Sequence, residues 1–282
     1  MKCTEEFLKN RIIFSKQTIE NSKLKVLKSK QFLFNDLKKS IDNWLNLIDG
    51  DEIALSIISK IVTGSTKLKD IATISQGLIP YDKYRGHSEE IIKNRIWNAT
   101  YKKDSTYKKE LRGKDVDRYK LTWNGMDWIS YGKWLAAPRK PEFFIKPRIL
   151  IREITSPRIL ATYTEEEYYN TPSIINCINF TIDIFFVLGV VNSELISFYH
   201  NITSPKANKG LFPKILVNDV RNLPIKIPSA SLLNKISQIV QQRLQQDFFA
   251  KNLDAEIDDL VYKIYNLNDE EIAYIKSWYK NK

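Results

Sequence analysis

The distribution of proline constrains the fold of this chain more than any other feature. All ten prolines lie between Pro80 and Pro228. Proline removes a backbone donor and clashes with the preceding helical turn, so this segment is a poor candidate for long helices. The proline-free segments on either side can form them. We therefore expect a helical connector over residues 1–65, a central domain over 66–228 and C-terminal helices over 229–282.

Apolar spacing predicts the helices at both ends. In the first segment, apolar residues recur at helical steps from Leu24 to Ile48, and the pattern resumes over residues 53–61 after Gly50. In the last segment, two stripes cover residues 232–244 and 253–264. Each stripe packs either on the core of this chain or against another domain, and the pattern alone leaves both open.

Short apolar runs bounded by turn residues characterise the central segment. Ile149–Ile151, residues 159–163 and Ile174–Ile178 are typical of strands, whereas Phe185–His200 has helical spacing. Asn124 and Gly125 indicate a turn. The expected fold class is α+β, with a mixed, mostly β domain flanked by helical segments.

Positive charge is concentrated in the middle of the chain. The 282 residues include 44 Lys and Arg against 33 Asp and Glu, a net charge of +11. Residues 83–118 hold eleven bases and six acids, while the C-terminal segment is acidic. This uneven distribution of charge favours one basic surface that binds phosphate groups. A generally lysine-rich composition is the alternative.

The absence of several sequence features disfavours whole classes of protein. Two cysteines, Cys3 and Cys177, cannot build a disulfide framework or a four-cysteine zinc site. The sequence contains no phosphate-loop, dinucleotide-binding or Pro-Asp nuclease motif. The charged first 15 residues do not read as a signal peptide, and no apolar run reaches the roughly 18 residues of a membrane helix. We expect a cytoplasmic, metal-free binding module rather than an enzyme.

Ordered blocks in the centre carry a family resemblance. They lie at residues 111–119, 128–132, 138–144, 146–152, 159–163, 168–173, 188–199, 212–215 and 222–225. In this order and spacing, about residues 68–228 resemble the TaqI-like C-terminal specificity domain of Type IIG restriction–modification enzymes, which is related to Type I specificity subunits. The tail at residues 257–267 resembles the usual end of those polypeptides.

The resemblance implies a module that recognises a short double-stranded DNA sequence. A methyltransferase using S-adenosylmethionine and a Mg²⁺-dependent nuclease would supply the catalysis, in cis or in trans, and no cofactor is expected in this chain. The alternative hypothesis is that the chain is a helical docking subunit for a catalytic partner, and that DNA binding is only a secondary property.

Basic and amide side chains in turn-rich segments are the candidate DNA contacts, because they can donate to base edges and phosphates. Arg148 and Arg152 share one face of a predicted strand with Leu150. An internal salt bridge with Glu153 or Glu142 is the alternative for that pair. The predicted DNA-binding residues are Lys83, Arg85, Arg139, Lys140, Arg148, Arg152, Lys206, Asn208 and Lys209.

Overall fold

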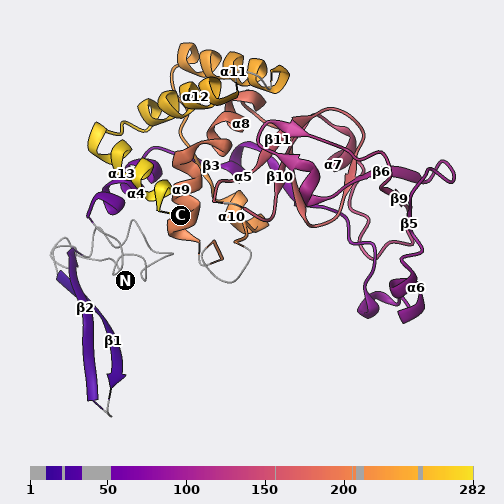
Figure 1. The fold of residues 1–282 in the computed structure, drawn as a ribbon, viewed down its shortest axis with the longest axis horizontal. Coiled ribbons are helices and arrows are strands. Elements are labelled where there is room, and N and C mark those ends of the chain that lie inside the picture. The colour runs from indigo at the N-terminus through magenta and orange to yellow at the C-terminus, as the bar shows by residue number, and fades with distance from the viewer. Residues whose placement is uncertain are drawn as a thin grey trace, which may run out of the picture.

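The computed structural model describes residues 11–20, 23–33, 52–155, 157–204, 206–207, 213–246 and 250–281. Two four-stranded sheets form the centre, and most of the helices lie on the side of the first sheet (Figure 1). The expected α+β class is confirmed.

The first sheet is antiparallel, in the order β11-β10-β13-β4. Its strands are β4 (Thr73–Gln76), β10 (Arg148–Arg152), β11 (Ala161–Thr164) and β13 (Ile174–Ile178). Side chains alternate between its faces, as the two-residue period requires. Ile149 and Ile151 join the main core with the helices, whereas Leu150 packs with Leu111 and Tyr168 on the other face. The strands expected near 149–151, 159–163 and 174–178 are confirmed.

Helices from both ends of the chain close the main core. They are α4 (Glu52–Val62), α5 (Leu68–Ile71), α8 (Ile184–Asn192), α9 (Glu194–Thr203), α10 (Val217–Arg221), α11 (Ala230–Gln245), α12 (Ala250–Ile264) and α13 (Asp269–Lys280). A side chain on Gly189 of α8 would come within 2.9 Å of Val240 on α11, so these helices need glycine to approach this closely. None of the described helices is both long and apolar enough to cross a bilayer.

The segment expected as one helix over residues 185–200 forms two. Asp183 caps α8 by accepting from the amides of Phe185 and Phe186, both at 2.9 Å. Ser193 then separates the helices, and its hydroxyl accepts from Ile196 N to cap α9. A serine cap inside an apolar run is a start signal that helical spacing alone does not reveal.

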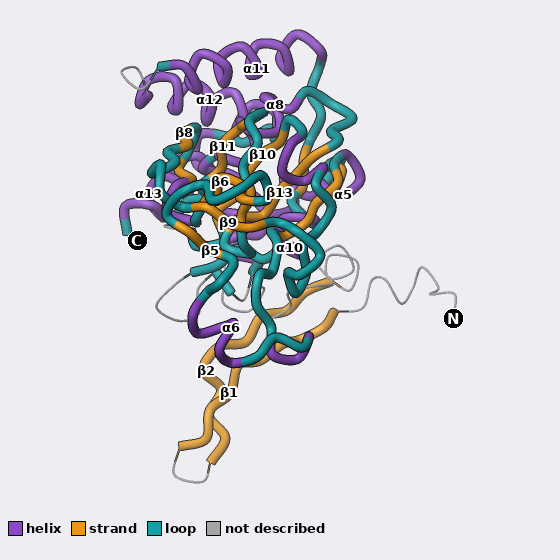
Figure 2. The backbone as a smooth tube through the Cα atoms, turned by 90° about the vertical axis from the view of Figure 1, so that its right-hand side faces the viewer, coloured by secondary structure: helices purple, strands orange, loops and turns teal. Residues whose placement is uncertain are grey.

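The second sheet, in the order β12-β6-β9-β5, forms the other side of the molecule. Its strands are β5 (Asn98–Ala99), β6 (Tyr107–Leu111), β9 (Trp128–Ser130) and β12 (Tyr169–Asn170). The helical turns η1 (Lys83–Arg85), α6 (Glu89–Asn94), η2 (Gly113–Asp115) and α7 (Glu142–Ile145) accompany it. Two smaller pairs are β3 (Thr66–Lys67) with β14 (Pro224–Ile225), and β7 (Val116–Asp117) with β8 (Lys120–Leu121). In both Figure 1 and Figure 2, α6 and the α11–α12 pair lie on opposite sides of the sheets.

The helix prediction for the N-terminal segment is wrong over much of its length. The structure has an antiparallel hairpin of β1 (Arg11–Glu20) and β2 (Lys23–Leu33). Lysine and apolar residues alternate from Lys23 to Val26, and β-branched and aromatic residues crowd β1, which favours strands over helix. The prediction holds for α4, while residues 34–51 lie outside the described residues.

Buried ion pairs join the C-terminal helices to the central segment. Arg158 contacts Asp258 of α12 at 3.0 Å and Glu194 of α9 at 3.3 Å. Tyr262 donates to the same Glu194 at 2.7 Å. Burial raises the pKa of Asp258 to about 6, against the lowering effect of Arg158. The C-terminal stripes thus pack on the core of this chain, one of the two alternatives that their pattern left open.

Candidate nucleic-acid interface

Two loops far apart in sequence are held side by side next to the second sheet. The first covers residues 76–88 and the second residues 131–141; together we call them the paired loops. Ile79 N donates to Ala137 O, and Ala137 N donates to Ile79 O, both at 2.8 Å. This bridge brings the segments of four predicted contacts together, namely Lys83, Arg85, Arg139 and Lys140.

The tip of the first loop is a tightly capped turn. Asp82 accepts from Tyr84 N at 2.8 Å and so caps η1 at its start. Gly86 ends the turn with a φ of 87°, a conformation that glycine adopts at little cost. Lys83, Tyr84 and Arg85 are therefore presented in one backbone conformation, and all three are exposed.

Arg85 and His87 bind the first loop to the second. Arg85 Nη1 donates to Ala136 O at 2.7 Å, and His87 Nε2 lies 2.9 Å from Trp134 O. A carbonyl oxygen can only accept, so Nε2 carries the proton in this contact. His87 Nδ1 is then free to accept from Asp82 N, which lies 3.4 Å away. His87 thus bridges the start of η1 and the second loop.

Glycine is required where the first loop leaves the first sheet. A side chain on Gly77 would lie 2.2 Å from the carbonyl oxygens of both Asn170 and Thr171. Gly77 O accepts from Arg139 Nε at 3.3 Å, and Tyr131 donates to Arg139 O at 2.8 Å. Arg139 is consequently half-buried and has a φ of 63°. It anchors the second loop, whereas its neighbour Lys140 is exposed.

A buried carboxylate supports the base of the first loop. Asn98 Nδ2 donates to Glu110 Oε2 at 2.8 Å, and Tyr81 donates to Asn98 Oδ1 at 2.9 Å. Trp97 N in turn donates to the Tyr81 hydroxyl at 2.9 Å. Burial raises the pKa of Glu110 to about 7, only partly offset by the positive charges of Arg112 and Arg95. Asn98 and Glu110 are not recognisable from the sequence, because their link to Tyr81 exists only in the fold.

The structure contradicts the predicted basic face of β10 at Arg148. This side chain is fully buried and donates to Lys146 O at 3.0 Å and to Tyr168 O at 3.1 Å. Burial lowers the pKa of Arg148 to about 10. The predicted alternative, an ion pair with Glu153 or Glu142, is also wrong for Arg148, since backbone carbonyls are its partners. Arg152, four residues further along the strand on the same face, is half-buried.

Of the remaining predicted contacts, the structure describes Lys206, which follows α9 in the chain. Lys206 is exposed, and its carbonyl accepts from Lys214 N at 3.3 Å. Asn208 and Lys209 lie outside the described residues. Lys206 is not among the residues that the paired loops bring together.

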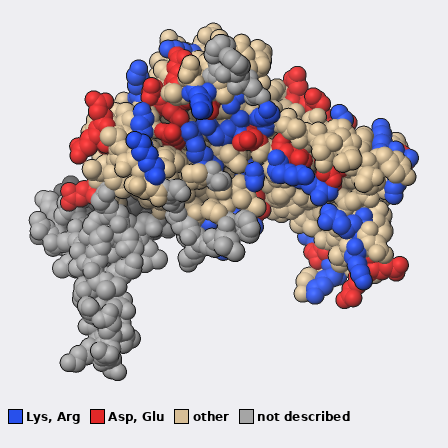
Figure 3. Space-filling model, viewed as in Figure 1, with Lys and Arg blue, Asp and Glu red and all other residues tan. Residues whose placement is uncertain are grey.

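Ion pairs within the chain neutralise part of the basic middle. Lys108 and Lys109 face Glu167 and Glu166, at 2.9 and 3.8 Å, and Arg112 pairs with Asp127. Within the described part of the chain, Lys83 and Lys140 form no ion pair of this kind. In Figure 3, Lys and Arg gather over the centre of this face and on the lobe at the lower right, with acids interspersed. The unpaired cations, rather than the total charge, mark the candidate surface.

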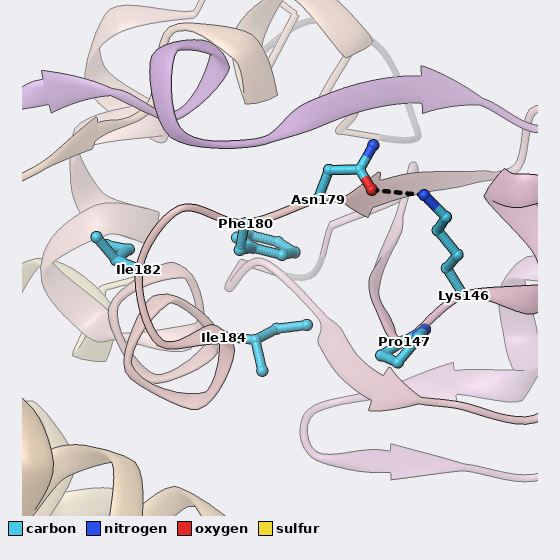
Figure 4. Close-up of a pocket in the computed structure, with 6 residues that line it drawn as sticks. All are labelled: Lys146, Pro147, Asn179, Phe180, Ile182 and Ile184. Carbon is cyan, nitrogen blue, oxygen red and sulfur yellow. Dashed lines mark hydrogen bonds between the residues drawn. The ribbon is translucent and has the colours of Figure 1, made fainter.

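A separate pocket of about 330 Å³ lies where β13 leads into α8 (Figure 4). Phe180, Ile182 and Ile184 make it largely apolar, and its one lysine, Lys146, donates to Asn179 Oδ1 at 2.9 Å. No paired acids or nucleophile line it. Among the described residues, no group of three or more His, Cys, Asp or Glu side chains is arranged to hold a metal ion.

The centre of the chain matches a known family in sequence. Residues 108–225 match the family described as the TaqI-like C-terminal specificity domain. A protein of Methanocaldococcus jannaschii, named as a type II restriction enzyme and methyltransferase, is 29% identical over 176 residues. That alignment covers 58% of this chain but only 15% of the relative. The first of the paired loops lies outside residues 108–225, and the second lies inside them.

Three solved structures resemble the chain at low sequence identity. The Type IIL restriction–modification enzyme MmeI, in complex with DNA, has a TM-score of 0.48 at 10% identity, covering 77% of this chain and 37% of that one. The type IIG restriction endonuclease BpuSI has the same TM-score and identity, covering 85% and 36%. The HsdS subunit from Thermoanaerobacter tengcongensis has a TM-score of 0.36 at 13% identity, covering 76% and 51%. Because these TM-scores are below 0.5, the assignment rests on the sequence matches. Residues 108–225 match the TaqI-like C-terminal specificity domain, and the chain covers only a small part of the relative's length.

Proposed function

We propose that the paired loops form the DNA-reading surface of this specificity domain. The observation that carries the proposal is the bridge between Ile79 and Ala137, which brings two cation-bearing loops together. Lys83, Arg85 and Lys140 are exposed on this unit. A rigid loop pair with three exposed cations suits a duplex, whose phosphates supply affinity and whose base edges supply specificity.

The three exposed cations have different roles in this proposal. Lys83 and Lys140 are flexible point charges, suited to phosphate oxygens. Arg85 donates one Nη1 hydrogen bond to Ala136 O, so its guanidinium is already oriented. An oriented guanidinium can bond the O6 and N7 atoms of guanine in the major groove, a contact worth about 1–3 kcal/mol of discrimination. Arg85 is therefore the proposed base-reading residue, and Arg139 its structural support.

The proposal places catalysis outside the described residues. A methyltransferase and a nuclease, joined to this chain or acting as separate subunits, would modify or cut the DNA that the specificity domain selects. S-adenosylmethionine and Mg²⁺ would serve those partners. The name of the M. jannaschii relative, which combines restriction enzyme and methyltransferase, supports this division.

Selection on a random duplex library tests the proposal. The purified chain is incubated with the library at low and at moderate salt, and the retained duplexes are sequenced. We expect an enriched motif of several base pairs, with each substitution in it costing about 1–3 kcal/mol. A wild-type chain that retains all duplexes equally at both salt concentrations would contradict a DNA-reading function.

A further inference from the structure

Tyr84 is the most exposed of the large hydrophobic side chains in the described part of the chain, with 87% of its surface accessible. Aromatic side chains usually bury a large area, and their exposure often marks a binding surface. Tyr101, Met126 and Trp134 are also exposed, at 63%, 61% and 39%, and all belong to the lobe built on the second sheet. Tyr84 differs from them because it stands between two cations.

The surroundings of Tyr84 match a nucleic acid rather than an apolar protein surface. Lys83 Nζ lies 4.9 Å from the centre of the Tyr84 ring, and Arg85 follows it directly. Asp82 is the acid nearest in sequence, and its carboxylate is committed to Tyr84 N and, at 3.9 Å, to Arg85. An exposed aromatic ring between positive charges provides a π-face for a base and partners for the flanking phosphates.

The turn that carries Tyr84 is ordered before any ligand binds. Gly86 N donates to Lys83 O at 3.3 Å and Arg85 N to Asp82 O at 3.1 Å, so the backbone is closed around the tip. His87 and Arg85 fasten this turn to the second loop. Binding then has little conformational entropy left to remove from the loop, and the energy of stacking remains available to distort the DNA.

We propose that Tyr84 is a stacking residue that enters a base step of the target duplex while Lys83 and Arg85 hold the adjacent backbone and groove. This inference rests on the proposed function and adds a specific way of reading DNA to it. Opening a step costs a few kcal/mol, and a wedge side chain partly replaces the lost stacking. Pyrimidine–purine steps open most easily, so the selected motif should contain such a step where Tyr84 enters.

Fluorescence of 2-aminopurine measures unstacking directly. The base analogue is placed at each adenine position in turn within the selected duplex, and its fluorescence is recorded with the wild type, Tyr84→Phe and Tyr84→Ala. Tyr101→Ala is the matched control, because Tyr101 is also an exposed tyrosine of the same lobe. Thermal unfolding of each variant verifies the fold, which truncation of an exposed side chain should leave intact.

We expect wild type and Tyr84→Phe to raise the fluorescence at one step. Tyr84→Ala should abolish that rise and weaken binding about 5- to 150-fold, the range that corresponds to the loss of one base–aromatic stack. Tyr101→Ala should behave as wild type.

Three results would overturn the inference. The first is wild-type DNA affinity in Tyr84→Ala. The second is a fluorescence rise that persists in Tyr84→Ala despite weaker binding, which would reduce Tyr84 to a surface contact. The third is unchanged DNA binding combined with loss of binding to a methyltransferase partner, which would assign the tip to a protein interface. In all three cases a motif is still selected and the proposed function stands; absence of any selected motif removes both.

Discussion

Glu110 gives the most quantitative test of how the paired loops are supported. Glu110 is 3% exposed, and its carboxylate accepts from Asn98, which in turn accepts from Tyr81 in the first loop. Burial raises the pKa of Glu110 from 4.5 to about 7. The folded chain therefore holds this proton more tightly than the unfolded chain, and stability falls as the pH rises from about 4.5 through 7.

The size of the effect follows from the shift. Each pKa unit corresponds to about 1.4 kcal/mol, so a rise from 4.5 to about 7 costs about 3 kcal/mol of unfolding free energy once the group is ionised. Glu110→Gln cannot ionise, and its amide oxygen can still accept from Asn98. We expect this variant to exceed the wild type by up to about 3 kcal/mol at pH 8.5 and to approach it at pH 5.

Urea unfolding at the two pH values measures this difference. Glu270→Gln, which neutralises an exposed acid of α13, is the control and should leave the change in stability between pH 5 and pH 8.5 as in the wild type. The reasoning is refuted if Glu110→Gln differs from the wild type by the same amount at both pH values. It is also refuted if the variant is less stable at pH 8.5.

Two further substitutions test the framework. Asp258→Ala removes the nearer of the two carboxylates that pair with Arg158 and leaves Glu194, at 3.3 Å, as the remaining one; we expect a loss of about 1–3 kcal/mol in urea unfolding, and unchanged stability would contradict a stabilising role. Gly77→Ala drives a methyl group against the carbonyls of Asn170 and Thr171, so it should lower the melting temperature and weaken DNA binding. Gly113→Ala, whose nearest contact would be an ordinary 3.5 Å, should change neither, and equal effects of the two glycine variants would contradict the requirement at Gly77.

Helices and buried strands were the predictable part of this fold. The stripes over residues 232–244 and 253–264 correspond to α11 and α12, because an amphipathic pattern of this length fits only a helix. Ile174–Ile178 is a fully buried strand, and a short run that is apolar except for Asn176 is typical of one. The hairpin β1–β2 escaped prediction because Leu24 and Leu27 fit a helical stripe while Lys23–Val26 also alternates as a strand does.

The candidate site was predictable only in its residue types. Lys83, Arg85 and Lys140 lie in turn-rich loops, which local sequence identifies. The bridge from Ile79 to Ala137 and the link from Glu110 to Tyr81 depend on contacts between segments far apart in sequence, which no local pattern contains. The prediction that Arg148 contacts DNA was wrong for the same reason, because the segment that carries Tyr168 covers its face of the strand.

The most direct test of the paired loops as a DNA-reading surface is the salt dependence of binding after removal of their exposed cations. Lys83, Arg85 and Lys140 are changed together to glutamine, and the control replaces three exposed lysines of α12 and α13, Lys263, Lys276 and Lys280, in the same way. Both variants lose three charges, so net charge alone cannot separate them. Fluorescence anisotropy on the selected duplex then gives the slope of log K against log salt for each. We expect the loop variant to lose up to about 1.8 of that slope, the share of the phosphate contacts proposed for Lys83 and Lys140. It should also lose its preference for the selected duplex over a scrambled one, because Arg85 is the proposed base-reading residue, while the control keeps both. Equal slopes and equal preference in the two variants would contradict the account.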